Sequence, residues 1–357
     1  MSTASSTEWT TTTLAPFTGL PLSASVRVLV SILGWLACVI GVFGNVLIIT
    51  TLLSQPALRS LHNLYVGNLA VADLVVVGYC MPFWLLDLSL GYMPVANQQH
   101  CDVNSFTLFV CLNASLYTLV LIGFNRYICV CHPGVYAKIF SKTKTIVSCV
   151  VVWVISASAS SLPFFHVENT AFVYSSKVHL CSFNGSYMGN LFTIISVINI
   201  VLPTIFIGFF SFSIFRYWTQ SRRRIGQWTQ NQRRSQAENQ SQSQSQRQKT
   251  LKAQPALSSA NMALIRSLVL VFLLLVLLCI PLSVVVAITG SVYVSPDVYG
   301  VLVLFFFLNN SINWIVYGLL NKNFRNGYRR LLVARCASSK ATAAEVEGTG
   351  MTLATVN

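Results

Sequence analysis

Long apolar stretches separated by short polar breaks dominate this chain. Because about 20 consecutive apolar residues cross a bilayer as a helix, each stretch of that length predicts a membrane-spanning helix. The seven stretches are Val26 to Leu53, Asn63 to Leu88, Asn104 to Val130, Thr145 to Phe165, Met188 to Tyr217, Met262 to Thr289 and Val298 to Leu320. The pattern predicts an all-α membrane protein, a seven-transmembrane helix bundle.

Polar segments divide the predicted chain further. Residues 1–25 form a Ser/Thr-rich extracellular tail, residues 26–320 the seven-helix transmembrane domain, and residues 321–357 an amphipathic helix with a cytoplasmic tail. Residues 321–333 carry apolar and basic side chains at helical spacing, which predicts a short amphipathic helix on the inner-leaflet surface. Residues 219–254 are rich in Gln, Ser and Arg, which predicts a disordered basic third inner loop. This loop is either a plain linker or one whose cluster Arg222 to Arg224 also attracts anionic lipid.

The distribution of charge orients the predicted bundle. Only 9% of the residues are charged, against roughly 25% in a soluble domain, which excludes a soluble monomer. Cytoplasmic loops collect Lys and Arg. With the amino terminus outside, only Arg27 and Lys177 of the 23 basic residues lie on the outer side. The net charge of +14 therefore indicates a cytoplasmic face and no nucleic-acid partner. We expect a multi-pass plasma-membrane protein with an extracellular amino terminus.

The cysteines are distributed unequally across the predicted membrane. Only Cys101 and Cys181 of the ten fall on the oxidising outer side, so we expect one disulfide, between the third span and the second outer loop. Asn184 begins an Asn-Gly-Ser glycosylation sequon in that loop. Cys336 follows the amphipathic stretch and is a candidate for palmitoylation, a reduced cytosolic thiol being the other interpretation.

Candidate chemistry is sparse. Asp73 is the only acid in the middle of a predicted span, whereas Asp87 lies at the outer end of the second span with the other outer acids. An intramembrane carboxylate is costly unless it is paired or functional. We find no nucleophile motif, phosphate loop or metal-ligand spacing, and the five His residues form no cluster, so an enzyme is not expected. A membrane transporter is the alternative function, but no repeat is evident and intramembrane charge is nearly confined to Asp73.

Short motifs follow one another along the seven spans. They are Gly44-Asn45, Asn68 to Asp73, Cys101, Asn125-Arg126-Tyr127, Trp153, Cys181, Pro203, Pro281 and Asn313 to Tyr317. In this order they resemble the rhodopsin-like (class A) G-protein-coupled receptors. Within that family, Asn125-Arg126-Tyr127 and residues 318–325 are most similar to the melatonin-receptor-like branch. A light-sensing opsin would need a Lys in the last span, which has none.

The resemblance implies a receptor that transmits an extracellular ligand signal to a heterotrimeric G protein. It assigns the switch that meets the G protein to Asn125, Arg126, Tyr127, Asn313 and Tyr317. The usual acid beside the arginine is replaced by Asn125, and Asn261 stands near the place of the family's helix-six acid. An arginine that merely snorkels to the interface is the alternative interpretation.

The resemblance also implies a sodium ion beside Asp73, and no other cofactor. The oxygen-bearing network around the ion consists of Asn45, Asp73, Ser115, Asn309 and Asn313. Oxygen ligands suit a small hard cation. A protonated Asp73 within a hydrogen-bond network is the alternative, because burial raises the pKa of a carboxyl group.

The ligand itself stays open. The resemblance assigns the pocket candidates Leu108, Phe164, Phe183, Asn199 and Cys279. Leu108 replaces the Asp of amine receptors, and a buried amine without a counter-ion is disfavoured, so we expect a neutral, lipidic or peptidic ligand or none. Most family members carry a Trp in place of Cys279. Compared with the melatonin-receptor pattern, Phe164 replaces an Asn, Asn199 a His and Gly185 a Gln, so we expect weak melatonin binding.

Overall fold

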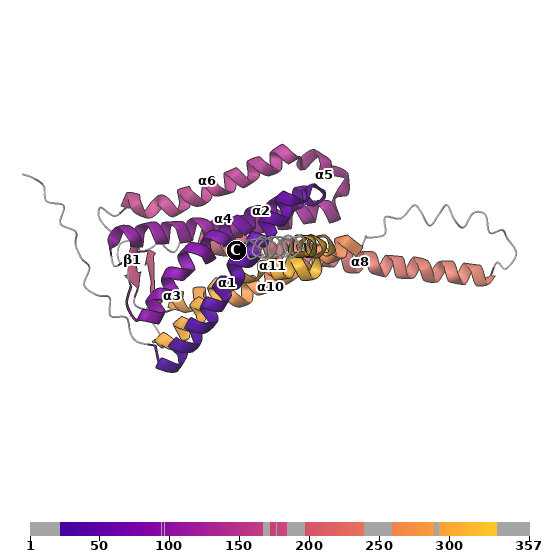
Figure 1. Cartoon of the computed structure of the whole chain (residues 1–357). Coiled ribbons are helices and arrows are strands. Elements are labelled where there is room, and N and C mark those ends of the chain that lie inside the picture. Colours follow the sequence, from indigo (N-terminus) through magenta and orange to yellow (C-terminus); the bar gives the residue numbers. More distant parts are fainter. Residues whose placement is uncertain are drawn as a thin grey trace, which may run out of the picture.

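The computed structural model describes residues 22–93, 95, 97–166, 172–175, 177–183, 197–238, 259–288 and 293–333. Most of the predicted outer tail, the sequon at Asn184, Cys336 and residues 239–254 of the third inner loop lie outside this part. Within it, seven helices are long and apolar enough to cross a membrane. They lie side by side along one direction, so the predicted seven-helix bundle is confirmed (Figure 1).

The helices match the predicted spans, with the differences mostly at their ends. Ser60 and Asn97 begin two of the helices as N-caps, each accepting a hydrogen bond from the amide three residues on. The spans are α1 (Ala24–Ser54), α2 (Leu61–Val75) continuing through the π-helical turn η2 (Val76–Cys80) into α3 (Met81–Leu90), α4 (Gln98–Cys131), α6 (Lys142–His166), η3 (Val197–Val201) with α8 (Leu202–Glu238), α10 (Ser259–Ile288) and α11 (Pro296–Leu320).

Helix α4 lies at the centre of the bundle. It packs against α2, α6 and α8, whereas α1 packs against α11 and α2, and α10 against α11. A β-hairpin, β1 (Phe172–Ser175) with β2 (Leu180–Phe183), covers one end of the bundle, and α5 (Pro133–Ile139) lies at the other (Figure 1). We call these the hairpin end and the arginine end, because Arg126 lies near the second. Helix α6 leaves most of its apolar side chains exposed, as a lipid-facing helix does.

The predicted disorder of residues 219–254 is wrong for residues 219–238. Helix α8 continues without a break to Glu238 and projects beyond the arginine end of the bundle (Figure 1). Gln, Arg and Glu are good helix formers, and a segment that extends an existing helix bears no nucleation cost. The guanidinium of Arg222 also lies 4.6 Å from the centre of the Trp218 ring, one turn earlier on the helix. The low hydrophobicity of residues 219–238 therefore reflects an exposed helix and not a disordered segment.

The predicted amphipathic helix after the last span is confirmed. Residues 322–333 are helical, with Phe324 and Tyr328 buried and Arg325, Arg329 and Arg330 exposed. The Phe324 ring packs against Tyr317 of α11, with 5.9 Å between the ring centres. This short helix is thereby attached to the arginine end of the bundle.

The sequence pattern did not predict the hairpin. Its antiparallel register pairs Phe172 with Phe183 and Tyr174 with Cys181. Four residues on each strand are too few for a clear alternation of apolar and polar side chains. The hairpin therefore adds a small sheet to a fold that is otherwise helical.

Candidate functional site

The hairpin is attached to the bundle by the expected disulfide. Cys101 of α4 and Cys181 of β2 are bonded, with their Cα atoms 5.5 Å apart. The Ser105 hydroxyl, one turn further along α4, donates a hydrogen bond to the Cys181 carbonyl at 2.9 Å. Both contacts hold the hairpin above the centre of the bundle.

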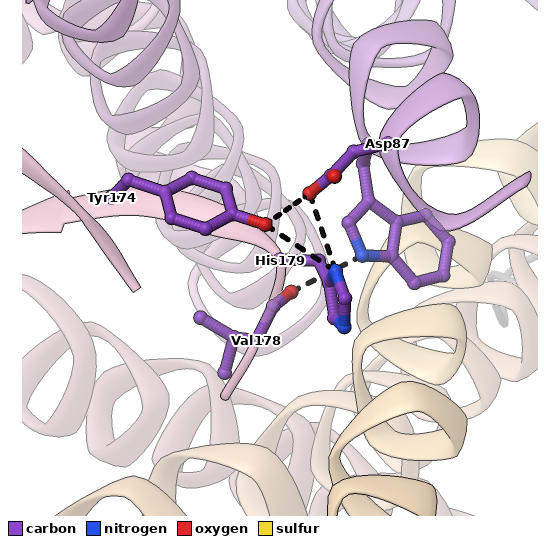
Figure 2. A network of polar contacts seen from close by, with 5 residues as sticks. Asp87, Tyr174, Val178 and His179 are labelled. Atoms are coloured by element: carbon purple, nitrogen blue, oxygen red, sulfur yellow. Dashed lines mark hydrogen bonds and ion pairs between the residues drawn. The ribbon is translucent and has the colours of Figure 1, made fainter. Parts of the chain in front are cut away.

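A buried polar network attaches the hairpin at a second place (Figure 2). Tyr174 of β1 donates a hydrogen bond to Asp87 Oδ2 of α3 at 2.5 Å, and His179 Nδ1 lies 3.3 Å from the same oxygen. Trp84, one turn before Asp87, donates its indole N–H to the Val178 carbonyl. Burial and the neighbouring carboxylate raise the pKa of the Tyr174 phenol, so Tyr174 stays the donor. The hairpin is thus fixed over two helices.

The sequence pattern did not predict this network, because Asp87 lies among the outer acids and His179 is one of five scattered histidines. The three side chains are separated by up to 92 residues along the chain, so only the fold brings them together. His179 also has a φ of 54°, which is rare for a residue other than Gly and which the sequence does not show.

The pocket candidates divide into two groups. Phe164 and Phe183 meet at the hairpin, where both pack against Phe172 with ring centres 5.5 and 5.2 Å apart. Asn199 lies at the start of the fifth span, and its Oδ1 accepts a hydrogen bond from Tyr117 of α4 at 2.5 Å. Leu108 is buried among apolar side chains, and Cys279 is partly buried on α10. The candidates therefore consist of an aromatic group at the hairpin, Phe164 and Phe183, and a second group of mixed polarity on the helices.

Asp73 is the centre of the polar network inside the bundle. Its Oδ1 accepts a hydrogen bond from Ser115 of α4 at 3.0 Å, and its Oδ2 accepts one from Asn313 of α11 at 2.7 Å. The side chain has no exposed surface. The structure thus brings together three of the five predicted network residues, from three different helices.

The other two predicted network residues make different contacts. Asn45 of α1 donates hydrogen bonds to the carbonyls of Gly41 and Asn310. Asn309 is buried on α11 and, within the described part of the chain, makes no hydrogen bond to Asp73. The amide oxygens of Asn45 and Asn310 are buried without a hydrogen-bond partner among the described residues. Such oxygens, with the Asp73 carboxylate and the Ser115 hydroxyl, are a donor set that fits a small hard cation.

Arg126 is buried near the end of α4, with 8% of its surface exposed. Among the described residues no carboxylate pairs with it, and its Nε has no hydrogen-bond partner. The side chain of Asn261 lies outside the described residues. A buried guanidinium without a counter-ion is available to a partner that supplies one.

The neighbours of Arg126 in the predicted motif are also held by polar contacts. Asn125 is fully buried and donates a hydrogen bond to the Tyr136 hydroxyl at 3.2 Å, while its amide oxygen has no hydrogen-bond partner among the described residues. The Tyr127 hydroxyl lies 3.0 Å from His132 Nε2. The contact with Tyr136 was not predicted, because nothing along the chain marks a tyrosine of α5 as a partner of α4.

Tyr317 connects the two polar sites. It is 2% exposed on α11, four residues beyond Asn313 and therefore on the same face of the helix. It packs in one buried cluster with Ile122 and Ile128 of α4, which lie on either side of Arg126 along that helix. Buried polar groups thus extend from Ser115 through Asp73 and Tyr317 to the arginine end.

The described residues form a bundle of seven membrane-spanning helices, with a disulfide-linked hairpin at one end and, at the other, an arginine that pairs with no described acid. The sequence matches the family described as 7 transmembrane receptor (rhodopsin family) over residues 44–317, and the chain belongs to this family. It is a multi-pass membrane protein and a G-protein-coupled receptor, and no observation supports the transporter alternative.

Melatonin receptors are among the curated proteins that this chain is similar to. It is 26% identical over 311 residues to melatonin receptor type 1A of Mus musculus, covering 84% of this chain and 79% of the relative. It is 27% identical over 328 residues to melatonin receptor type 1B of Homo sapiens, covering 87% of this chain and 81% of the relative. The similarity to the melatonin-receptor-like branch is thereby confirmed.

Proposed function

We propose that this receptor binds a ligand beneath the β-hairpin and activates a heterotrimeric G protein through Arg126 at the opposite end. The proposal rests on the buried polar side chains Ser115, Asp73 and Asn313, which are joined by hydrogen bonds, and on Tyr317 and Arg126, which are buried nearer the arginine end. A ligand and a G protein that both prefer one arrangement of these groups stabilise each other's binding. Pro281 within α10 removes a backbone hydrogen bond and supplies a hinge for this helix.

The same proposal places the hairpin end outside the cell. The disulfide needs an oxidising compartment, and the cluster Arg222 to Arg224 lies on α8 where this helix leaves the arginine end. With seven spans, the amino terminus is then extracellular and the carboxyl terminus cytoplasmic.

Cells that express the receptor with an amino-terminal epitope tag test both parts. Antibody binding to intact cells reads the orientation, and biosensors for each Gα class read ligand-independent and ligand-stimulated activation at matched surface density. We expect the tag on intact cells and a response from at least one Gα class. A tag that is detected only after permeabilisation, or the absence of any response in the whole panel, would contradict the proposal.

We propose that a sodium ion binds beside Asp73 and stabilises the inactive state. Sodium would be held by the Asp73 carboxylate, the Ser115 hydroxyl and the amide oxygens of Asn45, Asn309 or Asn313. The support is the full burial of the carboxylate and the amide oxygen of Asn45, which has no hydrogen-bond partner in the described part of the chain. A buried carboxylate that is shared between helices also changes its contacts whenever those helices move.

Replacing Asp73 by Asn should abolish the effect of sodium on ligand-independent signalling and leave surface expression largely intact, because the amide keeps the shape and removes the charge. The measurement is nucleotide exchange in membranes, with sodium varied against an equal concentration of N-methylglucamine. Asp87→Asn, which removes the other buried carboxylate of the second span, is the matched control and should keep the sodium effect. An unchanged sodium response in Asp73→Asn would favour a protonated Asp73 instead.

Replacing Asn125 by Asp should lower ligand-independent signalling at least about ten-fold, because the new carboxylate can pair with Arg126 and hold it in the inactive arrangement. A hydrogen bond to a charged group contributes about 1.5–3 kcal/mol, and 1.4 kcal/mol is a factor of ten. The measurement is basal G-protein activation at equal receptor density. Asn125→Ala, which removes the amide without adding charge, is the control, and an equal fall in both variants would contradict this explanation.

A further inference from the structure

A groove of about 550 Å³ lies on the surface of the bundle between α4 and α6. Val120 and Leu121 line it from α4, and Val147, Val151 and Ile155 line it from α6. The three α6 side chains are 54%, 46% and 49% exposed, so their apolar surface is uncovered by protein. In a membrane, lipid must cover this surface.

The groove is as long as one leaflet. Lys144 and Ile155 line its two ends and are 11 residues apart on α6, which is about 16 Å at 1.5 Å per residue. Half of a hydrocarbon core of about 30 Å is about 15 Å. A single acyl chain that enters at Lys144 therefore has room to lie along the groove.

The two ends of the groove differ in charge. Lys144 is exposed at the arginine end, where its Nζ donates one hydrogen bond to the Lys138 carbonyl at 2.7 Å. An ammonium group has three donors, so two remain for a ligand. Lys142 lies two residues before it, and the sequence from Pro133 to His166 contains no Asp or Glu. The polar end of the groove is therefore positively charged without an acid of α5 or α6 to neutralise it.

We propose that this groove is a specific binding site for one lipid of the inner leaflet with an anionic headgroup. The headgroup phosphate and carboxylate contact Lys144, and one acyl chain lies along Val147, Val151 and Ile155. Basic pockets between membrane-spanning helices on the cytoplasmic side are the kind of site that binds such headgroups. The assignment to the inner leaflet rests on the orientation proposed above.

Tyr117 gives the bound lipid a route into the bundle. Tyr117 lines the groove, and its hydroxyl donates the hydrogen bond to Asn199 at the start of the fifth span. An acyl chain in the groove restricts the Tyr117 ring and so stabilises its contact with Asn199. Occupancy of the groove should therefore raise the thermal stability of the receptor.

Native mass spectrometry of the full-length receptor in detergent micelles tests the site without requiring signalling or a membrane orientation. Palmitoyl-oleoyl phosphatidylserine and phosphatidylcholine are titrated separately, so that only the headgroup differs. We expect about five-fold stronger retention of phosphatidylserine, which corresponds to about 1 kcal/mol per charge at 1.4 kcal/mol per ten-fold change. Glycerophosphoserine, which has no acyl chains, should not displace the lipid.

Paired variants separate the groove from the rest of the surface. Lys144→Gln should remove the five-fold preference, whereas Lys322→Gln, on the helix after α11, should keep it. Val151→Trp fills the groove and should abolish retention, whereas Val154→Trp, on a 59% exposed position of α6 outside the groove lining, should not. If Val151→Trp lowers the thermal midpoint in the absence of lipid, Val147→Phe replaces it, with the same expected loss.

Several results would overturn the proposal. Equal retention of the two lipids would show ordinary surrounding lipid, and displacement by glycerophosphoserine would show a phosphate site that needs no chain. Equal losses in Val151→Trp and Val154→Trp would exclude the groove. Lipid-free dimers that Val151→Trp disrupts would make this face a contact between two copies of the receptor. Each of these results leaves the proposed G-protein coupling untouched, because the assay contains no G protein.

Discussion

Replacing Arg126 by Ala should remove basal and ligand-stimulated G-protein activation while the receptor still reaches the cell surface. Within the described part of the chain no acid pairs with the buried guanidinium. No internal ion pair therefore has to break before Arg126 contacts the G protein. Arginine anchors of protein interfaces typically contribute about 2–4 kcal/mol, which is about a 30- to 700-fold loss. The measurement is G-protein activation at matched surface density.

Arg59→Ala is the matched control for this prediction. Arg59 also lies at the arginine end, but it is exposed and donates hydrogen bonds to the carbonyls of Leu52 and Leu53. Its replacement should leave activation within about two-fold, as surface substitutions usually cost less than about 0.5 kcal/mol. If Arg126→Ala activates as well as Arg59→Ala does, Arg126 is only an interfacial side chain, and the proposed switch is wrong.

Melatonin should bind this receptor about 25- to 20,000-fold more weakly than it binds the melatonin receptors. Three polar positions of the melatonin-receptor pattern are altered here, to Phe164, Gly185 and Asn199. Phe164 packs on aromatic rings, and the Asn199 oxygen already accepts the Tyr117 hydroxyl. Each ligand group left without a partner costs about 1–3 kcal/mol, and two such losses give this range. Phe183 still offers an aromatic surface.

Saturation binding of radiolabelled melatonin to membranes measures this difference, with the mouse melatonin receptor type 1A as the positive control. The double variant Phe164→Asn with Asn199→His should recover at least about five-fold of the affinity, because one restored hydrogen bond contributes about 1 kcal/mol. Wild-type binding within ten-fold of the control would contradict the prediction and would make melatonin the first candidate ligand.

The sequence predicted the parts of the fold that depend on short-range patterns. Each membrane-spanning helix is a long apolar stretch, so its position follows from length and hydrophobicity alone. The disulfide between Cys101 and Cys181 followed because only two thiols were expected on the oxidising side. The contacts of Asp73 with Ser115 and Asn313 were expected from the resemblance to the receptor family.

Features that depend on the fold were not predictable in the same way. The network of Asp87, Tyr174 and His179 joins a helix to a hairpin that the pattern did not predict. The π-helical turn at residues 76–80 interrupts a span whose hydrophobicity is continuous. The long extension of α8 was predicted to be disordered because of its low hydrophobicity. The helix propensity of its residues predicts the opposite, and the pattern alone does not decide between the two.

Trp314 shows how the structure explains an unusual residue. Along the sequence it is one residue of the motif Asn313 to Tyr317, and nothing there shows what its side chain contacts. In the structure its ring lies directly against Gly44 of α1, where an added Cβ would overlap the indole. Phe43 packs edge-on against the same ring, with 5.9 Å between the ring centres. The large side chain and the glycine therefore fit together, which the sequence shows only once the two helices are known to be neighbours.

The most direct test of the central claim is guanine-nucleotide exchange with purified components. The wild-type receptor is reconstituted in nanodiscs with purified heterotrimers of each Gα class and no added ligand, and binding of a non-hydrolysable GTP analogue is followed. Because no carboxylate pairs with Arg126 within the described part of the chain, we expect the wild type to accelerate exchange on at least one heterotrimer. We expect Arg126→Ala to reduce this rate to that of empty nanodiscs, and Asn125→Asp to reduce it about ten-fold. No acceleration on any heterotrimer, or equal acceleration by the wild type and Arg126→Ala, would contradict the claim that Arg126 couples this receptor to a G protein.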